Sequence, residues 1–212
     1  MRRALKMLSV RYVVTIVFLG FLSATPTSVA AEAATRQAAM IVQDFSDQVL
    51  QLVTVKDISD AEKRVRFQGL LNTYFDVPTI GRFVLGRYWR RASAAEKSRY
   101  LGVFAKITAH SFVSRFSEYD GQLPRFISAS QIDDRYIIVK TEIFDPNGGS
   151  PPFQVNWRVV ANKTPMKIMD VVIEGVSLSI TQRAEYAGFI QQNGGRVANL
   201  ISALEKKLAE LK

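Results

Sequence analysis

The stretch "RYIIVKTEIFDPNGGSPPFQVNWRVVA", residues 135–161, decides the fold class. On both sides of "DPNGGSPP" the side chains alternate with a period of two: Ile137, Val139 and Thr141 occupy one set of positions, and Val155 and Trp157 do so after the loop. This alternation is typical of half-buried strands. Because the loop between them is rich in proline, glycine and asparagine, the stretch predicts an antiparallel hairpin.

Two further segments extend this hairpin into a sheet. "RFISAS" at 125–130 predicts a short strand, and "MKIMDVVIEGVSL" at 166–178 predicts the last one. Three or four strands joined by short turns form an antiparallel meander. The last strand ends at "EGVS", and from Thr181 the apolar residues follow a helical period. The chain therefore passes from the sheet into C-terminal helices.

Four amphipathic segments precede the sheet, at 34–53, 59–75, 76–86 and 93–119. Ser59 with Glu62 and Ser93 with Glu96 have the spacing of capping boxes, and Asp76 is a further N-cap candidate. Asn193, Gly194 and Gly195 divide the C-terminal helical region. The apolar faces of the first, fourth and terminal helices comprise Ala38, Ile41, Val42, Phe45, Val49, Leu52 and Val53; Tyr100, Val103, Phe104, Ile107, Phe112, Val113 and Phe116; and Val197, Leu200, Ile201, Leu204, Leu208 and Leu211. The apolar residues of the second helix are Val65, Leu70, Leu71, Tyr74 and Phe75. Helices, then a sheet, then helices predict an α+β fold.

The N-terminus has the pattern of a secretory signal peptide. Four basic residues lie within the first eleven, an apolar run follows at 12–22, and Ser28, Val29 and Ala30 form a small-x-small cleavage site after Pro26. The alternative is an uncleaved anchor, but the run is shorter than the ~20 residues that span a bilayer. We therefore expect residues 1–30 to be a signal peptide, 31–212 to be one domain, and the periplasm to be its location.

The composition limits the function classes. The chain of 212 residues is 48% hydrophobic and 22% charged, as globular proteins are, and it contains no cysteine. Without residues 1–30, 24 basic and 19 acidic residues remain, a net charge of +5 that favours anionic surfaces or acidic partners. No arginine-rich arm with interleaved aromatic residues indicates nucleic-acid binding.

The sequence contains almost no pattern typical of a catalytic site. His110 is the only histidine and lies within an amphipathic helix; no zinc-protease motif or phosphate loop is present. Gly175 and Ser177 do not extend to G-x-S-x-G, because residue 179 is serine. Asp170 and Glu174 are a carboxylate pair on one strand face, for which salt bridging or solvation is the simpler reading. We predict no catalytic residue, no metal ligand and no cofactor, and we read "EGVSL" as a strand-to-helix corner.

Three blocks resemble the Mla-type periplasmic phospholipid-binding proteins (the MlaC, or toluene-tolerance auxiliary, family). "FDVPTIGRFVLGRYWRRASAAEKSRYLGVFAKI" at 75–107 is similar to that family's FD-x-x-x-I…LG-x-x-[WY]-[RK] pattern. "FDPNGGSPPFQVNWRV" at 144–159 is similar to its hairpin, with one extra residue. "MKIMDVVIEGVSL" is similar to its EGVS corner, with Met166 where a tryptophan is common. The resemblance covers most of residues 35–212.

The resemblance implies an α+β fold with an apolar pocket for lipid acyl chains. It implies a carrier of phospholipid between an outer-membrane lipoprotein complex and an inner-membrane ABC transporter with an MCE component; for the hopanoid-associated (HpnM-like) branch, the cargo would be a hopanoid-type lipid. We expect the pocket between the third and fourth helices and the sheet. Its expected lining residues are Phe75, Ile80, Phe83, Val84, Tyr88, Phe104, Ile107, Phe112, Ile138, Phe144, Trp157, Val159 and Val171. Two rival functions stay open: an exported interaction module with a solid core, and a hydrolase that uses Ser177 or the Asp170 and Glu174 pair.

Overall fold

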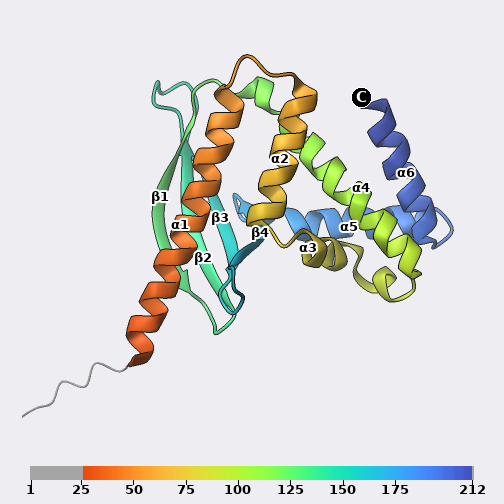
Figure 1. Ribbon diagram of the computed structural model, residues 1–212, viewed down its shortest axis with the longest axis horizontal. Coiled ribbons are helices and arrows are strands. Elements are labelled where there is room, and N and C mark those ends of the chain that lie inside the picture. The colour runs from red at the N-terminus through yellow and green to blue at the C-terminus, as the bar shows by residue number, and fades with distance from the viewer. Residues whose placement is uncertain (1–25, 212) are drawn as a thin grey trace, which may run out of the picture.

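The computed structural model describes residues 26–211 and has the predicted α+β order of helices, sheet and helices (Figure 1). The elements are α1 (Pro26–Thr54), α2 (Asp60–Tyr74), α3 (Val77–Leu85), the 3-10 helix η1 (Gly86–Arg90), α4 (Ala94–Val113), the 3-10 helix η2 (Phe116–Glu118), β1 (Leu123–Gln131), β2 (Tyr136–Phe144), β3 (Phe153–Val160), β4 (Lys167–Ile173), β5 (Val176–Ser177), α5 (Leu178–Gln192) and α6 (Val197–Glu210). No helix in these residues combines the length and hydropathy needed to cross a bilayer.

The sheet is the predicted antiparallel meander, with its strands in the order β1-β2-β3-β4-β5. It has five strands instead of about four, because the segment expected to form one last strand divides at Glu174 and Gly175. Both residues have positive φ angles, 48° and 82°. This turn folds Val176 and Ser177 back onto β4, so the "EGVS" corner is a tight hairpin followed directly by α5.

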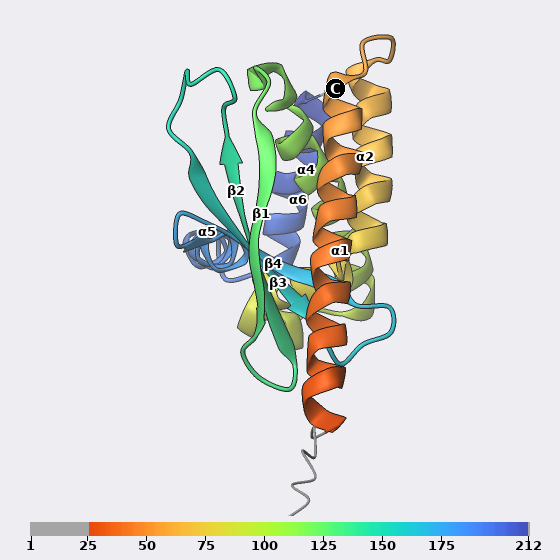
Figure 2. The same cartoon turned by 90° about the vertical axis from the view of Figure 1, so that its left-hand side faces the viewer.

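Helix α1 covers one face of β1 and β2 (Figures 1 and 2). The face consists of the alternating residues that the sequence indicates: Ile137 and Val139 are fully buried, and Val159 is buried on the neighbouring strand. Phe45 of α1 packs edge-on against Trp157, with 5.7 Å between ring centroids. The period of two on the strands and the helical stripe of α1 therefore meet in one apolar layer.

The helix ends follow the capping pattern read from the sequence. The hydroxyl of Ser59 accepts a hydrogen bond from the Glu62 amide, and Ser93 with Glu96 forms a complete capping box. Asp76 caps α3 by accepting from the Thr79 amide at 3.2 Å. Gly86 follows α3 with a φ of 57°, a conformation that favours glycine. The three N-caps fix where α2, α3 and α4 begin, and Gly86 marks where α3 ends.

Two sequence predictions about the helices are wrong in detail. Helix α4 ends at Val113 instead of residue 119, and the 3-10 helix η2 continues the chain to the sheet. Phe112, expected on the buried side of the fourth helix, is 37% exposed, although its ring packs on Phe67 with 5.5 Å between centroids. Among the apolar residues of α2, Val65 is 71% exposed, because it lies about 200° around the helix from the buried Phe67.

Helix α1 begins at Pro26 and therefore passes through the cleavage site expected at Ala30, whereas most of the expected signal peptide, residues 1–25, lies outside the described residues.

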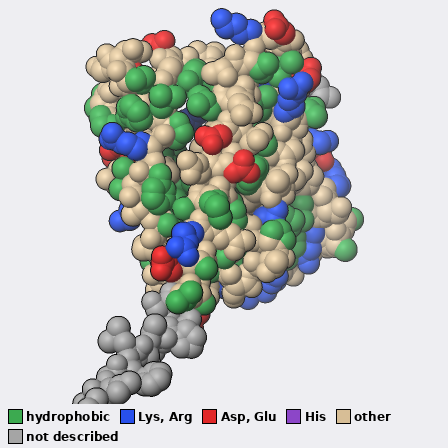
Figure 3. Space-filling model, turned by 60° about the vertical axis from the view of Figure 1, so that its left-hand side comes forward, with side chains coloured by type: hydrophobic (Ala, Val, Ile, Leu, Met, Phe, Trp, Pro, Cys, Tyr) green, Lys and Arg blue, Asp and Glu red, His purple; other side chains and the backbone are tan. Residues whose placement is uncertain are grey.

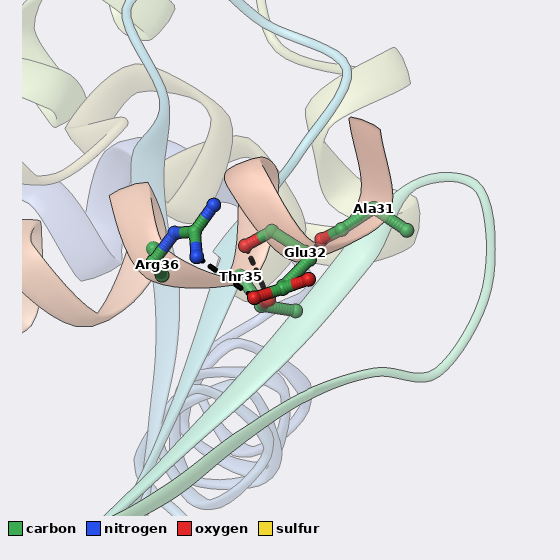
Figure 4. A network of polar contacts seen from close by, with 4 residues as sticks. All are labelled: Ala31, Glu32, Thr35 and Arg36. Carbon is green, nitrogen blue, oxygen red and sulfur yellow. Dashed lines mark hydrogen bonds and ion pairs between the residues drawn. The ribbon is translucent and has the colours of Figure 1, made fainter. Parts of the chain in front are cut away.

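The exposed N-terminal turns of α1 carry local contacts (Figure 4). The hydroxyl of Thr35 donates to the carbonyl oxygens of Ala31 and Glu32, and Arg36 pairs with Glu32 at 2.8 Å. Such pairs stabilise a helix by only ~0.2–0.5 kcal/mol each. Among residues 29–54 of α1, whose exposure is described, the first fully buried one is Ala38.

Candidate functional site

The apolar interior is divided into two cores. The first, here called the sheet core, lies between α1, α2, the end of α4 and the sheet; its buried residues are Ala38, Val42, Phe45, Leu52, Phe67, Leu71, Ala109, Val113, Ile137, Val139, Val155, Trp157, Val159, Met166 and Ile168. The second, the helical core, lies between α3, η1, the start of α4, α5 and α6; its buried residues are Val84, Leu85, Tyr88, Ala92, Tyr100, Val103, Phe104, Tyr186, Ile190, Val197, Leu200, Ile201 and Leu204.

The two cores meet along a line that we call the seam. Helix α4 runs through both, since Phe104 belongs to the helical core and Ala109 to the sheet core. Between them on α4 lies Ile107, which is buried but belongs to neither core. Val77, at the start of α3, packs against both. The seam is therefore apolar, and α3 and α4 are the elements that border it.

Contacts between β4 and the α2–α3 junction hold one end of the seam. The amide of Asp76 donates to the Ile168 carbonyl oxygen at 3.2 Å, and Phe75 pairs with the same strand. The Asp76 carboxylate also pairs with Lys163 of the β3–β4 loop at 2.5 Å. Partial burial of Asp76 opposes ionisation, but the bonds from Lys163 and Thr79 outweigh it and lower the pKa of Asp76 below its usual value. The junction is thus fixed to the sheet while α3 continues into the helical core.

The residues expected to line one pocket are distributed over both cores. Trp157 and Val159 are in the sheet core with Phe75 and Val171 packed against it, and Val84, Tyr88 and Phe104 are in the helical core with Ile80 packed against it. Phe83 and Phe112 are 39% and 37% exposed. Ile138 and Phe144 are half-buried at the strand positions that alternate with the α1-facing set. The structure therefore divides the first two groups between the two cores, and the last four residues belong to neither core.

Two depressions open to solvent lie at the edges of this arrangement. One of about 390 Å³ lies between α3 and the β3–β4 loop, with Phe75, Asp76, Lys163 and Lys167 in its lining. The other, of about 290 Å³, is lined by Leu85, Gly86, Arg87, Tyr88, Arg183, Ala187 and Gln191. Their sizes fall near the lower end of the range for small-ligand sites. Neither contains the group of residues expected for the pocket beyond Phe75 and Tyr88.

Buried polar groups fix side chains within each of the two cores. On the sheet side, the indole N–H of Trp157 donates to the Thr141 hydroxyl at 2.9 Å, which in turn donates to the Val155 carbonyl oxygen at 3.0 Å. On the helical side, the Tyr100 hydroxyl donates to the Gly81 carbonyl oxygen at 3.1 Å. Burial raises the pKa of Tyr100 and of Tyr186, so both phenols stay neutral. These side chains contribute apolar surface without an unpaired charge.

The "EGVS" corner has the geometry of a framework element. Ser177 caps α5 by accepting from the Ile180 amide, and its hydroxyl donates to the Asp170 carboxylate at 2.6 Å. The same carboxylate accepts from the Ser179 amide. His110 lies elsewhere, with its Nε2 donating to the Leu211 carbonyl oxygen at 2.9 Å. Within residues 26–211 no hydrogen bond joins His110 to Ser177, and no group of three or more potential metal ligands is found.

The sequence patterns do not single out Arg87 or Arg183, which line the same depression although they are far apart in the chain. The sequence feature that could have indicated a basic surface here is the charge of residues 77–99, which include six basic residues and one acidic residue. Charge alone could not have placed Arg183 beside this segment, because that requires α5 to pack on α3.

Comparisons with known proteins agree with this architecture. The family model described as "MlaC protein" matches residues 43–206. The intermembrane phospholipid transport system binding protein MlaC of Haemophilus influenzae is 23% identical over 139 residues, which are 65% of this chain and 64% of that protein. The chain thus spans less than two thirds of this relative. The phospholipid-binding protein from Ralstonia solanacearum, solved in complex with a phospholipid, matches with a TM-score of 0.70 and 20% identity over 82% of this chain and 98% of its own.

The family model covers well over half of the chain, including every element from the middle of α1 to the middle of α6. The structural match supports the same fold, with helices before and after an antiparallel sheet. Together with the three sequence blocks, these findings establish that the chain belongs to the MlaC family.

Proposed function

We propose that this protein is a lipid carrier that holds the acyl chains of a phospholipid at the seam between its two cores. The observation that carries the proposal is the division of the interior: Phe104 and Ala109 lie on one helix yet belong to different cores, with Ile107 buried between them. Membership in the MlaC family, and the phospholipid named for both relatives, support the choice of cargo.

The seam suits acyl chains because its walls are apolar on both sides. Trp157 and Val159 belong to the sheet core on one side, and Val84 and Phe104 belong to the helical core on the other. A lipid with two chains has on the order of 30 methylenes, and transferring them from water to an apolar site is worth ~24 kcal/mol. When acyl chains enter the seam, the apolar side chains of the two cores lose contacts with each other and gain contacts with methylene groups. The buried apolar area of the protein therefore changes little. Uptake from a bilayer, where the chains are already out of water, is then close to neutral.

The direction of transport must therefore come from partners. We propose that the protein is exported to the periplasm and moves lipid between an outer-membrane lipoprotein complex and an inner-membrane ABC transporter with an MCE component. The relative from Haemophilus influenzae is named as part of an intermembrane transport system, which supports this assignment. A hopanoid-type lipid would use the same apolar contacts, and chemical analysis of the bound lipid distinguishes the two cargoes.

Binding without catalysis is the simplest account of the corner residues. Ser177 and Asp170 are hydrogen-bonded to each other and to the start of α5, where they cap the helix. A serine nucleophile requires a base within hydrogen-bonding reach. The hydrogen bond of His110 instead goes to the C-terminal backbone at Leu211.

A matched pair of variants tests the seam. Ile107→Glu places a carboxylate at a position that is 6% exposed, where an unpaired charge loses several kcal/mol of solvation and competes with acyl chains. Val65→Glu makes a comparable change on α2 at a position that is 71% exposed. We expect Ile107→Glu to lower the lipid per folded chain and Val65→Glu to leave it unchanged, as measured by lipid extraction and mass spectrometry of the monodisperse fraction.

Ile107→Thr provides a milder change if the glutamate variant does not fold, because it keeps the branching at Cβ and replaces the ethyl group by an uncharged hydroxyl. Circular dichroism of each variant separates loss of folding from loss of lipid. Equal lipid content per folded chain in the Ile107 and Val65 variants would contradict the proposal and favour a solid-core interaction module.

A further inference from the structure

A basic surface with exposed apolar side chains lies around α3, η1 and α5. The only acidic residue in segment 77–99 is Glu96, and its carboxylate accepts the Ser93 amide at the start of α4. Arg99 in this segment is paired with Glu205. Among residues 26–211, by contrast, no ion pair joins Arg87 or Arg90 to a carboxylate. The charges of these two exposed guanidinium groups are therefore not compensated by the protein.

Arg183 of α5 joins these residues from a distant part of the chain. Its Cζ lies 5.0 Å from the centroid of the Phe83 ring, and a Cβ added at Gly86 would lie 3.0 Å from its Nε. Arg183 and Arg87 line the same open depression of about 290 Å³. Arg183 is exposed, and no ion pair within the described residues involves it. Two guanidinium groups thus border one site.

Apolar side chains lie beside these charges. Phe83 is 39% exposed under Arg183, and Ile180, one turn before Arg183 on α5, is 56% exposed. In a 3-10 helix, side chains three positions apart lie on the same side, so Arg87 and Arg90 of η1 point in a common direction. We call Phe83, Arg87, Arg90, Ile180 and Arg183 the arginine face. In Figure 3, Lys and Arg side chains gather along the lower right margin of the view.

This combination matches the surface of an anionic bilayer. Guanidinium groups bind phosphate oxygens in bidentate geometry, and a basic residue near an anionic leaflet contributes roughly a fivefold gain in affinity. A small soluble anion could bind the arginines but would leave Phe83 and Ile180 in water, whereas a leaflet offers acyl chains beneath its phosphates. The depression also reaches the helical core, since Leu85 and Tyr88 belong to both.

We propose that the arginine face docks the protein on a membrane leaflet that contains anionic phospholipid. The inference goes beyond the proposed function, because docking does not require a lipid to be extracted. In this orientation the start of α4 and the helical core lie on the side of the protein that approaches the bilayer.

The test measures vesicle binding by flotation, using protein exported through its own N-terminal segment with its processed N-terminus determined by mass spectrometry. The vesicles are phosphatidylcholine alone or an equal mixture with phosphatidylglycerol, at low salt. We expect binding to the mixed vesicles only. Because the Debye length falls from 30 Å at 0.01 M to 3 Å at 1 M, added salt should remove it.

Two double variants with the same loss of charge localise the interaction. Arg87→Gln with Arg183→Gln should weaken binding to the mixed vesicles by roughly 25-fold, the product of two fivefold losses. Lys56→Gln with Arg115→Gln removes two exposed charges, in the α1–α2 loop and after α4, that form no ion pair in the described residues. This control should bind as the parent protein does. Arg87→Lys with Arg183→Lys keeps both charges but loses the bidentate geometry, so its affinity should lie between those of the glutamine variant and the parent protein.

Three results would overturn the proposal. Equal weakening in both glutamine double variants would show that only net charge matters. Equal binding of the parent protein to both kinds of vesicle would assign the interaction to another apolar segment. Capture by immobilised polyglutamate without vesicle binding would assign the face to an acidic protein partner. Lipid extracted from the same samples is measured separately, so failure of docking and failure of lipid carriage are distinguishable.

Discussion

Thr141→Val removes one buried hydroxyl oxygen beside Trp157 of the sheet core and should destabilise the protein measurably. Thr141 is 6% exposed and Trp157 is 9% exposed, so solvent cannot replace the lost partner. The hydroxyl accepts from the indole N–H at 2.9 Å and donates to the Val155 carbonyl oxygen. Leaving a buried donor unsatisfied costs ~1–3 kcal/mol. Valine is as favourable as threonine in a strand, so we attribute the expected loss of about 2 kcal/mol to the hydrogen bonds.

For a domain of this size, 1 kcal/mol corresponds to ~2–4 °C in Tm, so we expect thermal unfolding about 4–8 °C lower. Thr141→Ser keeps the hydroxyl and removes only a methyl group, so its loss should be smaller. In a double-mutant cycle with Trp157→Phe, the two changes should be coupled by ~1 kcal/mol, because they share one hydrogen bond. A Thr141→Val protein with the parent Tm, or a cycle without coupling, would refute this account of how Trp157 is held.

Two further predictions concern polar contacts away from the seam. Ser177→Ala removes the cap of α5 and should lower the free energy of unfolding by ~1–2 kcal/mol, as measured by chemical denaturation, while leaving lipid content unchanged. Loss of a catalytic turnover with unchanged stability would instead support the hydrolase. The hydrogen bond to Asp44 raises the pKa of Tyr74 to about 12, so Asp44→Asn should shift one tyrosine in an absorbance titration toward its usual value of 10.0. Because the pKa of Tyr74 is higher in the folded than in the unfolded protein, the stabilisation from this bond is present below pH ~10 and is lost as the pH rises through about 12. If the parent and the Asp44→Asn variant differ in stability by the same amount below and above this pH range, this prediction is contradicted.

The sequence predicts the local structure well where one side chain or one period controls it. Ser59, Asp76 and Ser93 cap the helices that their spacing predicts. The alternation at Ile137 and Val139 identifies the buried face of the sheet. The divided last strand was not predictable from periodicity, because the turn at Glu174 depends on a left-handed backbone at a residue other than glycine.

The division of the core was harder to predict, for a geometric reason. A helix of 20 residues such as α4 is about 30 Å long, which is about the diameter of a small domain, so it can contribute to two cores. Its apolar stripe looks continuous in the sequence, yet Tyr100 and Phe104 contact the helical core while Val113 contacts the sheet core. Periodicity identifies which residues of α4 are buried, but the partners of each residue depend on how α5 and α6 fold back. A single pocket lined from both cores therefore stays a prediction.

The most direct measurement of the central claim is native mass spectrometry of the exported protein, purified without detergent or added lipid. The account predicts a folded chain that carries a phospholipid, released by organic solvent and identified by fragmentation. A hopanoid-type lipid in its place would keep the carrier and change its cargo. A protein that is lipid-free on purification, and still lipid-free after incubation with phospholipid vesicles, would contradict the claim that the seam holds acyl chains.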